Sequence, residues 1–258
     1  MAAGLPVPPG FVLSPEAVER IALGSASAPE RGLLEAKLHR VGLPVAVRSS
    51  AIGEDGSAAS FAGQHLSVLN LTDVDAMLFA IASVWSSGRS ASARAYRERM
   101  GIVGEPKVAA VVQALVPSDV AGVLFTVDPI SGSPERLVVE ATWGFGEAVV
   151  AGLVTPDHYV ITRRGKVIEQ LIGQKDIAIR AMSGGGTRET DVDAVQQTAA
   201  CLDGQSLTRL VALGLACERI FGPRQDIEWT LAGGKLYLLQ SRPVTTARQH
   251  RTAATGSP

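Results

Sequence analysis

The most informative stretch of the chain lies near its C-terminal end and reads Asp226-Ile-Glu-Trp-Thr-Leu-Ala-Gly-Gly-Lys-Leu-Tyr-Leu-Leu-Gln-Ser-Arg-Pro243. Two alternating runs flank Gly233-Gly234, a pattern typical of a β-hairpin, which we expect from about 226 to 242. The hairpin carries Glu228, Gln240 and Arg242. A carboxylate and a neutral oxygen can bind Mg²⁺, and an arginine can stabilise charge on a phosphate during its transfer. The stretch therefore suggests a phosphoryl-transfer site.

The register of this hairpin decides whether these side chains can meet. Alternation places Asp226 and Glu228 on one face of the first strand, and Leu238, Gln240 and Arg242 on one face of the return strand. A two-residue Gly-Gly turn alone would point Glu228 and Gln240 to opposite faces, so the functional interpretation requires a three-residue loop or a bulge. An ordinary amphipathic hairpin with a solvated polar face fits the same pattern.

Composition limits the class of protein. The chain has 258 residues, 46% of them hydrophobic, which is enough to form one large domain or two lobes. A net charge of −1 argues against nucleic-acid binding through a broad basic face. Cys201 and Cys217 have no metal-ligand spacing and are expected to be reduced thiols in a helical region. With neither a secretory signal nor a long apolar run, we expect a cytoplasmic protein that does not bind membranes.

The order of elements predicts a mixed sheet flanked by helices in two lobes. Helices are expected from Pro15, over 29–40, over 73–99 with an interruption at 86–90, and over 191–221. Strands are expected at 44–47, 107–116, 121–127, 136–141, 158–162 and 166–172. The Gly/Ser/Ala-rich segment 48–63 reads as a long loop of the kind that is usually functional or disordered, and the polar tail 244–258 is expected to be disordered.

Two further residues are candidates for binding. Arg48 stands where a strand gives way to the Gly-rich loop, so it can bind phosphate in a bidentate fork; a surface arginine beside a floppy loop is the alternative. Gln113 lies inside an apolar strand and must be hydrogen-bonded, either to local backbone or in a pocket. No GxxxxGK[ST] motif occurs, so a P-loop fold is unsupported.

Several segments are informative when they are taken in order. They are GLPVPPGF (4–11), VRSSA (47–51), SFAGQ (60–64) with Leu69-Asn70, Val112-Gln113, GVLFT (122–126) with Asp128-Pro129, EATWGFGE (140–147), VTPD (154–157) and LQSRP (239–243). Together they resemble one family: the ATP-grasp nucleotide-binding domain of phosphoenolpyruvate synthase, pyruvate phosphate dikinase and rifampicin phosphotransferase. The resemblance covers about residues 4–244.

The resemblance implies an α/β (α+β) fold of the ATP-grasp type, with mixed or antiparallel sheets, flanking helices and a nucleotide cleft between two lobes. We expect an N-terminal lobe over 1–105 with a lid loop at 48–67, a C-terminal lobe over 106–244, and a disordered tail over 245–258.

The same resemblance assigns residue roles. Arg48 matches an arginine on the ATP phosphates, and Gly63 and Ser67 match the lid loop. Gln113 with Ala114, Leu115 and Val116 matches the segment at the adenine. Glu228 and Gln240 match the Mg²⁺ and ATP ligands, and Arg242 matches the catalytic arginine, with Arg48 as its partner in catalysis.

The implied function is an ATP- and Mg²⁺-dependent phosphotransferase whose acceptor is a small-molecule hydroxyl or a histidine on a separate protein. Two features depart from the family. Its usual domain begins with a lysine-bearing LGGKGANL-like element, and the full enzymes continue into a phosphohistidine domain; neither motif occurs in this sequence. The alternatives are therefore a non-catalytic nucleotide-binding or regulatory module, or a fragment of a larger dikinase.

Overall fold

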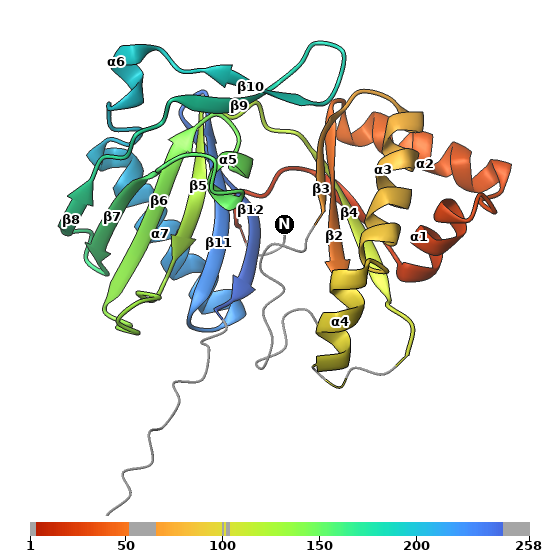
Figure 1. Ribbon diagram of the computed structural model, residues 1–258, viewed down its shortest axis with the longest axis horizontal. Coiled ribbons are helices and arrows are strands. Elements are labelled where there is room, and N and C mark those ends of the chain that lie inside the picture. The colour runs from red at the N-terminus through yellow and green to blue at the C-terminus, as the bar shows by residue number, and fades with distance from the viewer. Residues whose placement is uncertain (1–3, 52–65, 100, 102–103, 245–258) are drawn as a thin grey trace, which may run out of the picture.

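The computed structural model describes residues 4–51, 66–99, 101 and 104–244 (Figure 1). In this part of the chain the strands form a four-stranded sheet, a six-stranded sheet and a two-stranded hairpin. All the ladders between these strands are antiparallel. The two larger sheets stand beside each other, and helices cover the side of the four-stranded sheet that faces away from the six-stranded one (Figure 1).

The four-stranded sheet has the order β1-β4-β2-β3. Its strands are β1 (Gly10–Leu13), β2 (Val45–Ala51), β3 (Ser67–Leu71) and β4 (Val108–Ala114). The accompanying helices are α1 (Pro15–Ala22), α2 (Ala28–Val41), α3 (Val74–Ser87) and α4 (Ala91–Arg99). Alternate residues of the strands, such as Val47 and Val112, pack with Val18 and Ile81 of the helices in one buried core. The other face of β2 and β4 is left for Arg48 and Gln113.

Local sequence explains where these helices begin. Ser14 precedes Pro15 and its side chain accepts a hydrogen bond from the Ala17 N–H. Ser27 and Glu30 form a reciprocal capping box, and Asp73 caps α3. These contacts satisfy the backbone N–H groups that the first turn of a helix leaves without an intrahelical partner.

The six-stranded sheet has the order β12-β11-β5-β6-β7-β8. Its strands are β5 (Val120–Phe125), β6 (Arg136–Trp143), β7 (Asp157–Thr162), β8 (Val167–Leu171), β11 (Gln225–Ala232) and β12 (Lys235–Pro243). The long helix α7 (Gly204–Phe221) covers one face, where Leu210 packs with Leu124, Tyr159, Ile227 and Trp229. Short helices α5 (Glu147–Val150) and α6 (Ala194–Gln197) lie at one end.

The remaining strands, β9 (Ile177–Ala181) and β10 (Thr187–Asp191), form a separate hairpin. This hairpin extends across the top of the view in Figure 1, from the six-stranded sheet to the four-stranded sheet. The sequence suggested only an exposed turn at Gly184–Gly186, because neither strand has a marked apolar pattern.

Strand β4 bears on the division into lobes. The expected boundary at 105 would separate β4 from the sheet to which it is hydrogen-bonded, since β4 pairs with both β1 and β2. The composition of the segments before β1 and after β4 does not indicate that these two strands pair. We therefore propose that the two lobes divide after Ala114.

Some local expectations were wrong. The helix expected over 191–221 is two helices, because Asp193 caps α6 and Asp203 caps a new start at α7. Cys201 lies in the loop between them; Cys201 and Cys217 are both free thiols. The loop expected from residue 48 begins later, since β2 continues to Ala51. Most of the expected lid, including Gly63, and the tail 245–258 lie outside the described residues. No helix within the described ranges is long and apolar enough to span a membrane.

A fully buried ion pair joins β7 to the segment before β9. Both Lys175 and Asp157 have 0% side-chain exposure, and their charged groups are in contact. Asp157 also accepts hydrogen bonds from the backbone N–H groups of Gly173 (3.0 Å) and Cys201 (2.7 Å). Lys175 donates a further bond to the Gly173 carbonyl. Asp157, at the start of β7, thus holds together the loop between β8 and β9 and the loop between α6 and α7.

Lys175→Met should lower the free energy of unfolding by about 3–5 kcal/mol, because it leaves a buried carboxylate without its counter-charge. Denaturant titration of the variant and wild type measures this loss. Lys166→Met is the matched control, since Lys166 is exposed, and its effect should stay within about 0.5 kcal/mol. Equal effects from the two substitutions would contradict a role for the buried pair.

Candidate functional site

A cavity of about 750 Å³ lies between the two large sheets. It is lined by side chains from β2, β3 and β4 on one side and from β5, β6, β11 and β12 on the other. Every predicted site residue within the described part of the chain lines it: Arg48, Ser67, Gln113, Ala114, Leu115, Val116, Glu228, Gln240 and Arg242. The structure therefore brings together residues that are far apart in the sequence.

The hairpin contains the register change that the functional interpretation requires. A two-residue turn at Gly233-Gly234, both with positive φ, pairs Ala232 with Lys235. The register shifts between Glu228 and Trp229, so Trp229 pairs with Leu238 but Glu228 pairs with Gln240. Leu239 is the extra residue of this β-bulge. The bulge places Gln240 directly opposite Glu228, on the same face of the sheet.

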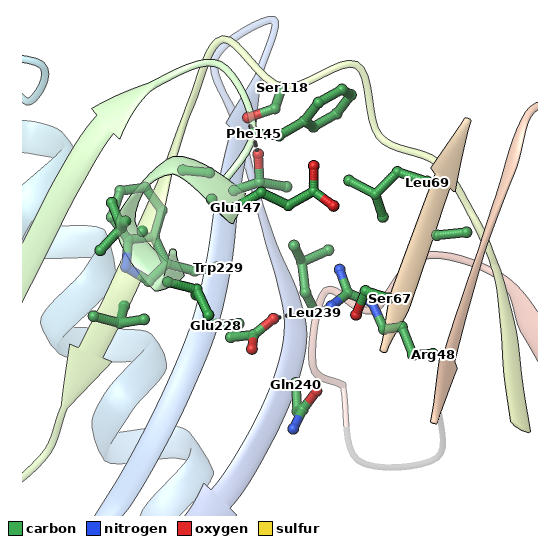
Figure 2. A pocket seen from close by; sticks show the side chains of 18 of the residues that line it. Arg48, Ser67, Leu69, Ser118, Phe145, Glu147, Glu228, Trp229, Leu239 and Gln240 are labelled. Atoms are coloured by element: carbon green, nitrogen blue, oxygen red, sulfur yellow. Dashed lines mark hydrogen bonds and ion pairs between the residues drawn. The ribbon is translucent and has the colours of Figure 1, made fainter. Parts of the chain in front are cut away.

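The bulge also corrects one expectation. Leu238 was expected to share a face with Gln240 and Arg242, but it is buried in the core on the α7 side. The side chain of Leu239 instead lines the cavity (Figure 2). Strict alternation fails here because the return strand has one more residue than its partner.

Charged groups gather at one end of the cavity. Arg48 Nη1 donates to Glu228 Oε2 at 2.9 Å, which joins β2 to β11 across the cavity. The two side chains are only 13% and 27% exposed. Arg48 Nε is buried and has no hydrogen-bond partner among the described residues. A buried donor without a partner is costly, so this guanidinium is ready to accept an anionic ligand.

A second ion pair lies one step along the same hairpin. Arg242 Nε donates to Asp226 Oδ2 at 2.8 Å, and these residues are direct cross-strand partners. Burial raises the pKa of Asp226; the nearby Arg242 cation acts in the opposite direction, and the Glu228 carboxylate adds to the rise. Asp226 orients the Arg242 side chain through Nε and leaves its terminal nitrogens for another partner.

The opposite end of the cavity is apolar. Leu69 and Phe145 lie toward one end in Figure 2, whereas Arg48, Glu228 and Gln240 lie toward the other. Leu69 and Phe145 belong to a small hydrophobic cluster that also packs against Leu115. The buried Gln113 amide reaches the Pro8 carbonyl at 3.5 Å, a long contact. The site thus combines a flat apolar space with a charged end, as a nucleotide requires.

Sequence reasoning missed Glu140 and Glu147, which also line the cavity. Glu147 lies between the apolar and charged ends (Figure 2). Burial raises its pKa, while the charge of Arg48 and a 3.5 Å hydrogen bond from Thr187 Oγ1 act in the opposite direction. The Gly-rich turn 143–147 was the signal available in the sequence. The structure shows why glycine is required there: at Gly144, φ is +73° and an added Cβ would lie 2.4 Å from the Ile179 carbonyl oxygen.

The donor groups at the charged end suit Mg²⁺. Glu228 supplies a carboxylate and Gln240 an amide oxygen, and both are hard oxygen ligands. The described residues contain no group of three or more His, Cys, Asp or Glu side chains able to hold a metal ion. A Mg²⁺ ion typically shares one or two protein ligands with substrate phosphates and water, which matches this small donor set.

Glu147→Gln should raise the melting temperature of the nucleotide-free protein at neutral pH. Because burial raises the pKa of Glu147, the folded state holds this proton at pH values where the unfolded chain has lost it, so stability falls as pH rises through that window. The advantage of the variant should disappear at a pH below the ordinary glutamate value. Melting curves across pH test this, with the exposed Glu189→Gln as a control that should show no such trend.

The sequence of this chain matches those of known proteins. Residues 30–257 match the family model described as pyruvate phosphate dikinase, AMP/ATP-binding domain. A rifampicin phosphotransferase of Streptomyces sviceus is 43% identical over 202 residues, which cover 78% of this chain and 23% of the relative. A probable phosphoenolpyruvate synthase of Archaeoglobus fulgidus is 40% identical over 212 residues, which cover 81% and 28%. The chain spans about a quarter of the length of these curated relatives.

Among solved structures, an ADP complex of N5-carboxyaminoimidazole ribonucleotide synthetase aligns with 95% of this chain and 43% of its own, with a TM-score of 0.41 and 11% identity. Because this TM-score is low, the family is assigned from the sequence matches alone. These extend over most of the chain and include the segments that build both walls of the cavity. The fold is α/β with antiparallel sheets, and the chain belongs to the family of pyruvate phosphate dikinase AMP/ATP-binding domains.

Proposed function

We propose that this chain binds ATP with Mg²⁺ in the cavity between its sheets and acts as the phosphoryl-donating unit of a phosphotransferase. One observation carries the proposal. The bulge at Leu239 sets Gln240 opposite Glu228, and Arg48 of the other sheet meets Glu228 at 2.9 Å. Metal ligands and a phosphate-binding arginine therefore converge at the charged end of one cavity, and an apolar space lies at its other end.

The direction of the nucleotide follows from this polarity. The adenine ring would lie by Leu69 and Phe145, beside the segment from Gln113 to Val116, because an aromatic ring gains most from the apolar end. The triphosphate would then extend toward Arg48, Arg242 and Ser67; the expected lid residue Gly63 lies outside the described residues. Ser67 is the cross-strand partner of Arg48, so its hydroxyl is close to that end.

Each charged residue has a distinct task in this proposal. Arg48 and Arg242 neutralise the phosphates, and Asp226 holds Arg242 in orientation through Nε. Glu228 and Gln240 would hold Mg²⁺, which would offset the negative charge of the phosphates. Transfer through a loose transition state requires positioning and charge stabilisation, so Arg242 contributes most when the phosphoryl group is between donor and acceptor.

The acceptor is a small-molecule hydroxyl or a histidine on a separate protein or domain. A relative named rifampicin phosphotransferase supports an eventual small-molecule acceptor. The identity of the product separates the routes. Direct transfer to a hydroxyl leaves ADP, whereas the relay through a histidine that the family resemblance implies leaves AMP. Chromatography of the nucleotide products therefore decides between them.

Glu228→Gln should remove the gain in ATP affinity that Mg²⁺ provides. We expect at least about a tenfold weakening of Mg²⁺–ATP binding, equivalent to about 1.4 kcal/mol, because the metal loses its carboxylate ligand. Binding of ATP in EDTA should be retained, since Arg48 is released from its ion pair. Calorimetry with and without Mg²⁺ measures both. Glu169→Gln, on exposed β8, should match wild type; an unchanged Mg²⁺ effect in Glu228→Gln would refute the metal assignment.

Arg242→Ala should reduce turnover at least about a thousandfold, in line with the loss of a transition-state arginine, while Mg²⁺–ATP still binds. Turnover is measured as nucleotide product formed in the presence of candidate acceptors, and binding by calorimetry. The exposed Arg219→Ala on α7 is the control. Full turnover in Arg242→Ala would sink the assignment. Binding without turnover in the wild type, with every acceptor tried, would favour a non-catalytic nucleotide-binding module instead.

A further inference from the structure

Asn70 of β3 hydrogen-bonds to the tip of the β9–β10 hairpin and so links the hairpin to the four-stranded sheet. Its side-chain Nδ2 donates to the carbonyls of Met182 and Gly186, each at 2.7 Å. The Gly186 N–H donates in return to the Asn70 carbonyl at 2.9 Å. We call these three hydrogen bonds the Asn70 clasp. It joins elements more than a hundred residues apart in sequence.

The backbone of β3 is shaped to present this amide. Asn70 is 3% exposed and has a φ of +59°, a left-handed conformation that asparagine tolerates better than most residues. The β2–β3 register shifts at the same point, with Val45 opposite Leu71 but Val47 opposite Val68. Asn70 therefore lies in a bulge of β3, which turns it away from the ladder and toward the hairpin.

The same hairpin also contacts the opposite wall of the cavity. The Phe145 N–H donates to the Ile179 carbonyl at 2.9 Å, and Gly144 forms an isolated bridge with Ile179. Thr187 on β10 bonds to Glu147 at 3.5 Å. The hairpin thus touches Phe145 and Glu147 on one wall.

On the other wall, Leu69 is the residue next to Asn70, and it lines the cavity. Leu69, Phe145 and Ile179 share one buried cluster. The hairpin is therefore continuous with both sides of the apolar end: the clasp fixes it beside Leu69, and Ile179 fixes it beside Phe145. Figure 1 shows this span between the two sheets.

We propose that Asn70 is a positioning residue for the nucleotide: through the β9–β10 hairpin it sets the separation of the Leu69 and Phe145 walls. This inference rests on the proposed function, because the ligand between those walls is ATP. Asn70 itself does not line the cavity and acts only through the hairpin. With the clasp intact the walls are already spaced for binding, so ATP need not supply the free energy of bringing them together.

The test compares two substitutions that separate backbone from side chain. Asn70→Gly keeps the positive φ at low cost but removes both side-chain donors. Asn70→Asp keeps the size and shape but sets carboxylate oxygens against two carbonyls. Arg188→Ala is the control, because Arg188 is exposed on the same hairpin and outside the clasp. Mg²⁺–ATP binding is followed by calorimetry, and opening of residues 182–186 by hydrogen exchange.

We expect both Asn70 variants to bind Mg²⁺–ATP about tenfold or more weakly, because only a minor fraction of molecules would then have the walls spaced for binding, with unchanged stoichiometry. Exchange at 182–186 should rise while α7 stays protected, and Arg188→Ala should match wild type. In turnover assays KM should rise more than kcat falls. A purely structural role would instead reduce stoichiometry and kcat at constant Kd.

The outcomes are distinguishable. Wild-type affinity in Asn70→Gly, whether or not exchange at 182–186 rises, overturns the inference and leaves the proposed function standing. Lower stoichiometry at unchanged Kd also overturns it, since that result reports a loss of folded protein. Absence of Mg²⁺–ATP binding by the wild-type chain overturns the proposed function, and the inference with it.

Discussion

The ion pair between Arg48 and Glu228 is the contact on which the cavity depends. It joins the two large sheets through side chains 180 residues apart, and both partners are mostly withdrawn from water. Bringing either charge into this space alone would be costly, so each requires the other while the nucleotide is absent. In the proposed function, a phosphate would take the place of Glu228 beside Arg48, and a cation would take the place of Arg48 beside Glu228. The charges of both side chains would then be compensated before and after binding.

The other residues of the site make one side of the cavity charged and the other side apolar. Hydrogen bonds within the β11–β12 hairpin fix Gln240 and Arg242 on the charged side, and the hairpin from β9 to β10 borders the apolar side. Glu147 lies between them, and burial raises its pKa. A negative charge on this side chain is therefore less stable in the middle of the cavity than it would be in water. Specificity for a molecule with one flat apolar end and one anionic end follows from the layout as a whole.

Local signals in the sequence predicted much of this structure. Helix starts at Ser14, Ser27 and Asp73 depend on residues a few positions apart, and they could be found by pattern. The bulged hairpin could be stated as a requirement because alternation is a local rule, although which residue was extra could not. The family resemblance then joined Arg48 and Gln113 to the hairpin, and the structure places all of them on one cavity.

What could not be predicted depends on contacts between distant segments. Nothing near Lys175 marks it as buried, since its partner Asp157 and the Cys201 N–H come from other loops. From the sequence, Glu147 and Asn70 were only members of segments that resemble the family, and neither was assigned a role. Their roles become visible only when the β9–β10 hairpin is placed against both. The pairing of β4 with β1 and β2 likewise depends on contacts between distant segments.

The extra residue at Leu239 has a consequence for how this protein can change in length. Side chains alternate between the two faces of a strand, so the face that a residue takes depends on whether the number of residues before it is odd or even. Because of the bulge, the return strand has one more residue between the Gly-Gly turn and Gln240 than its partner has between Glu228 and the turn. Insertion or loss of one residue between the turn and Gln240 would exchange the inward and outward sets, and Gln240 and Arg242 would move toward the core. A change of two residues would leave them in the cavity. Length in the paired part of this hairpin is therefore constrained by parity more than by size.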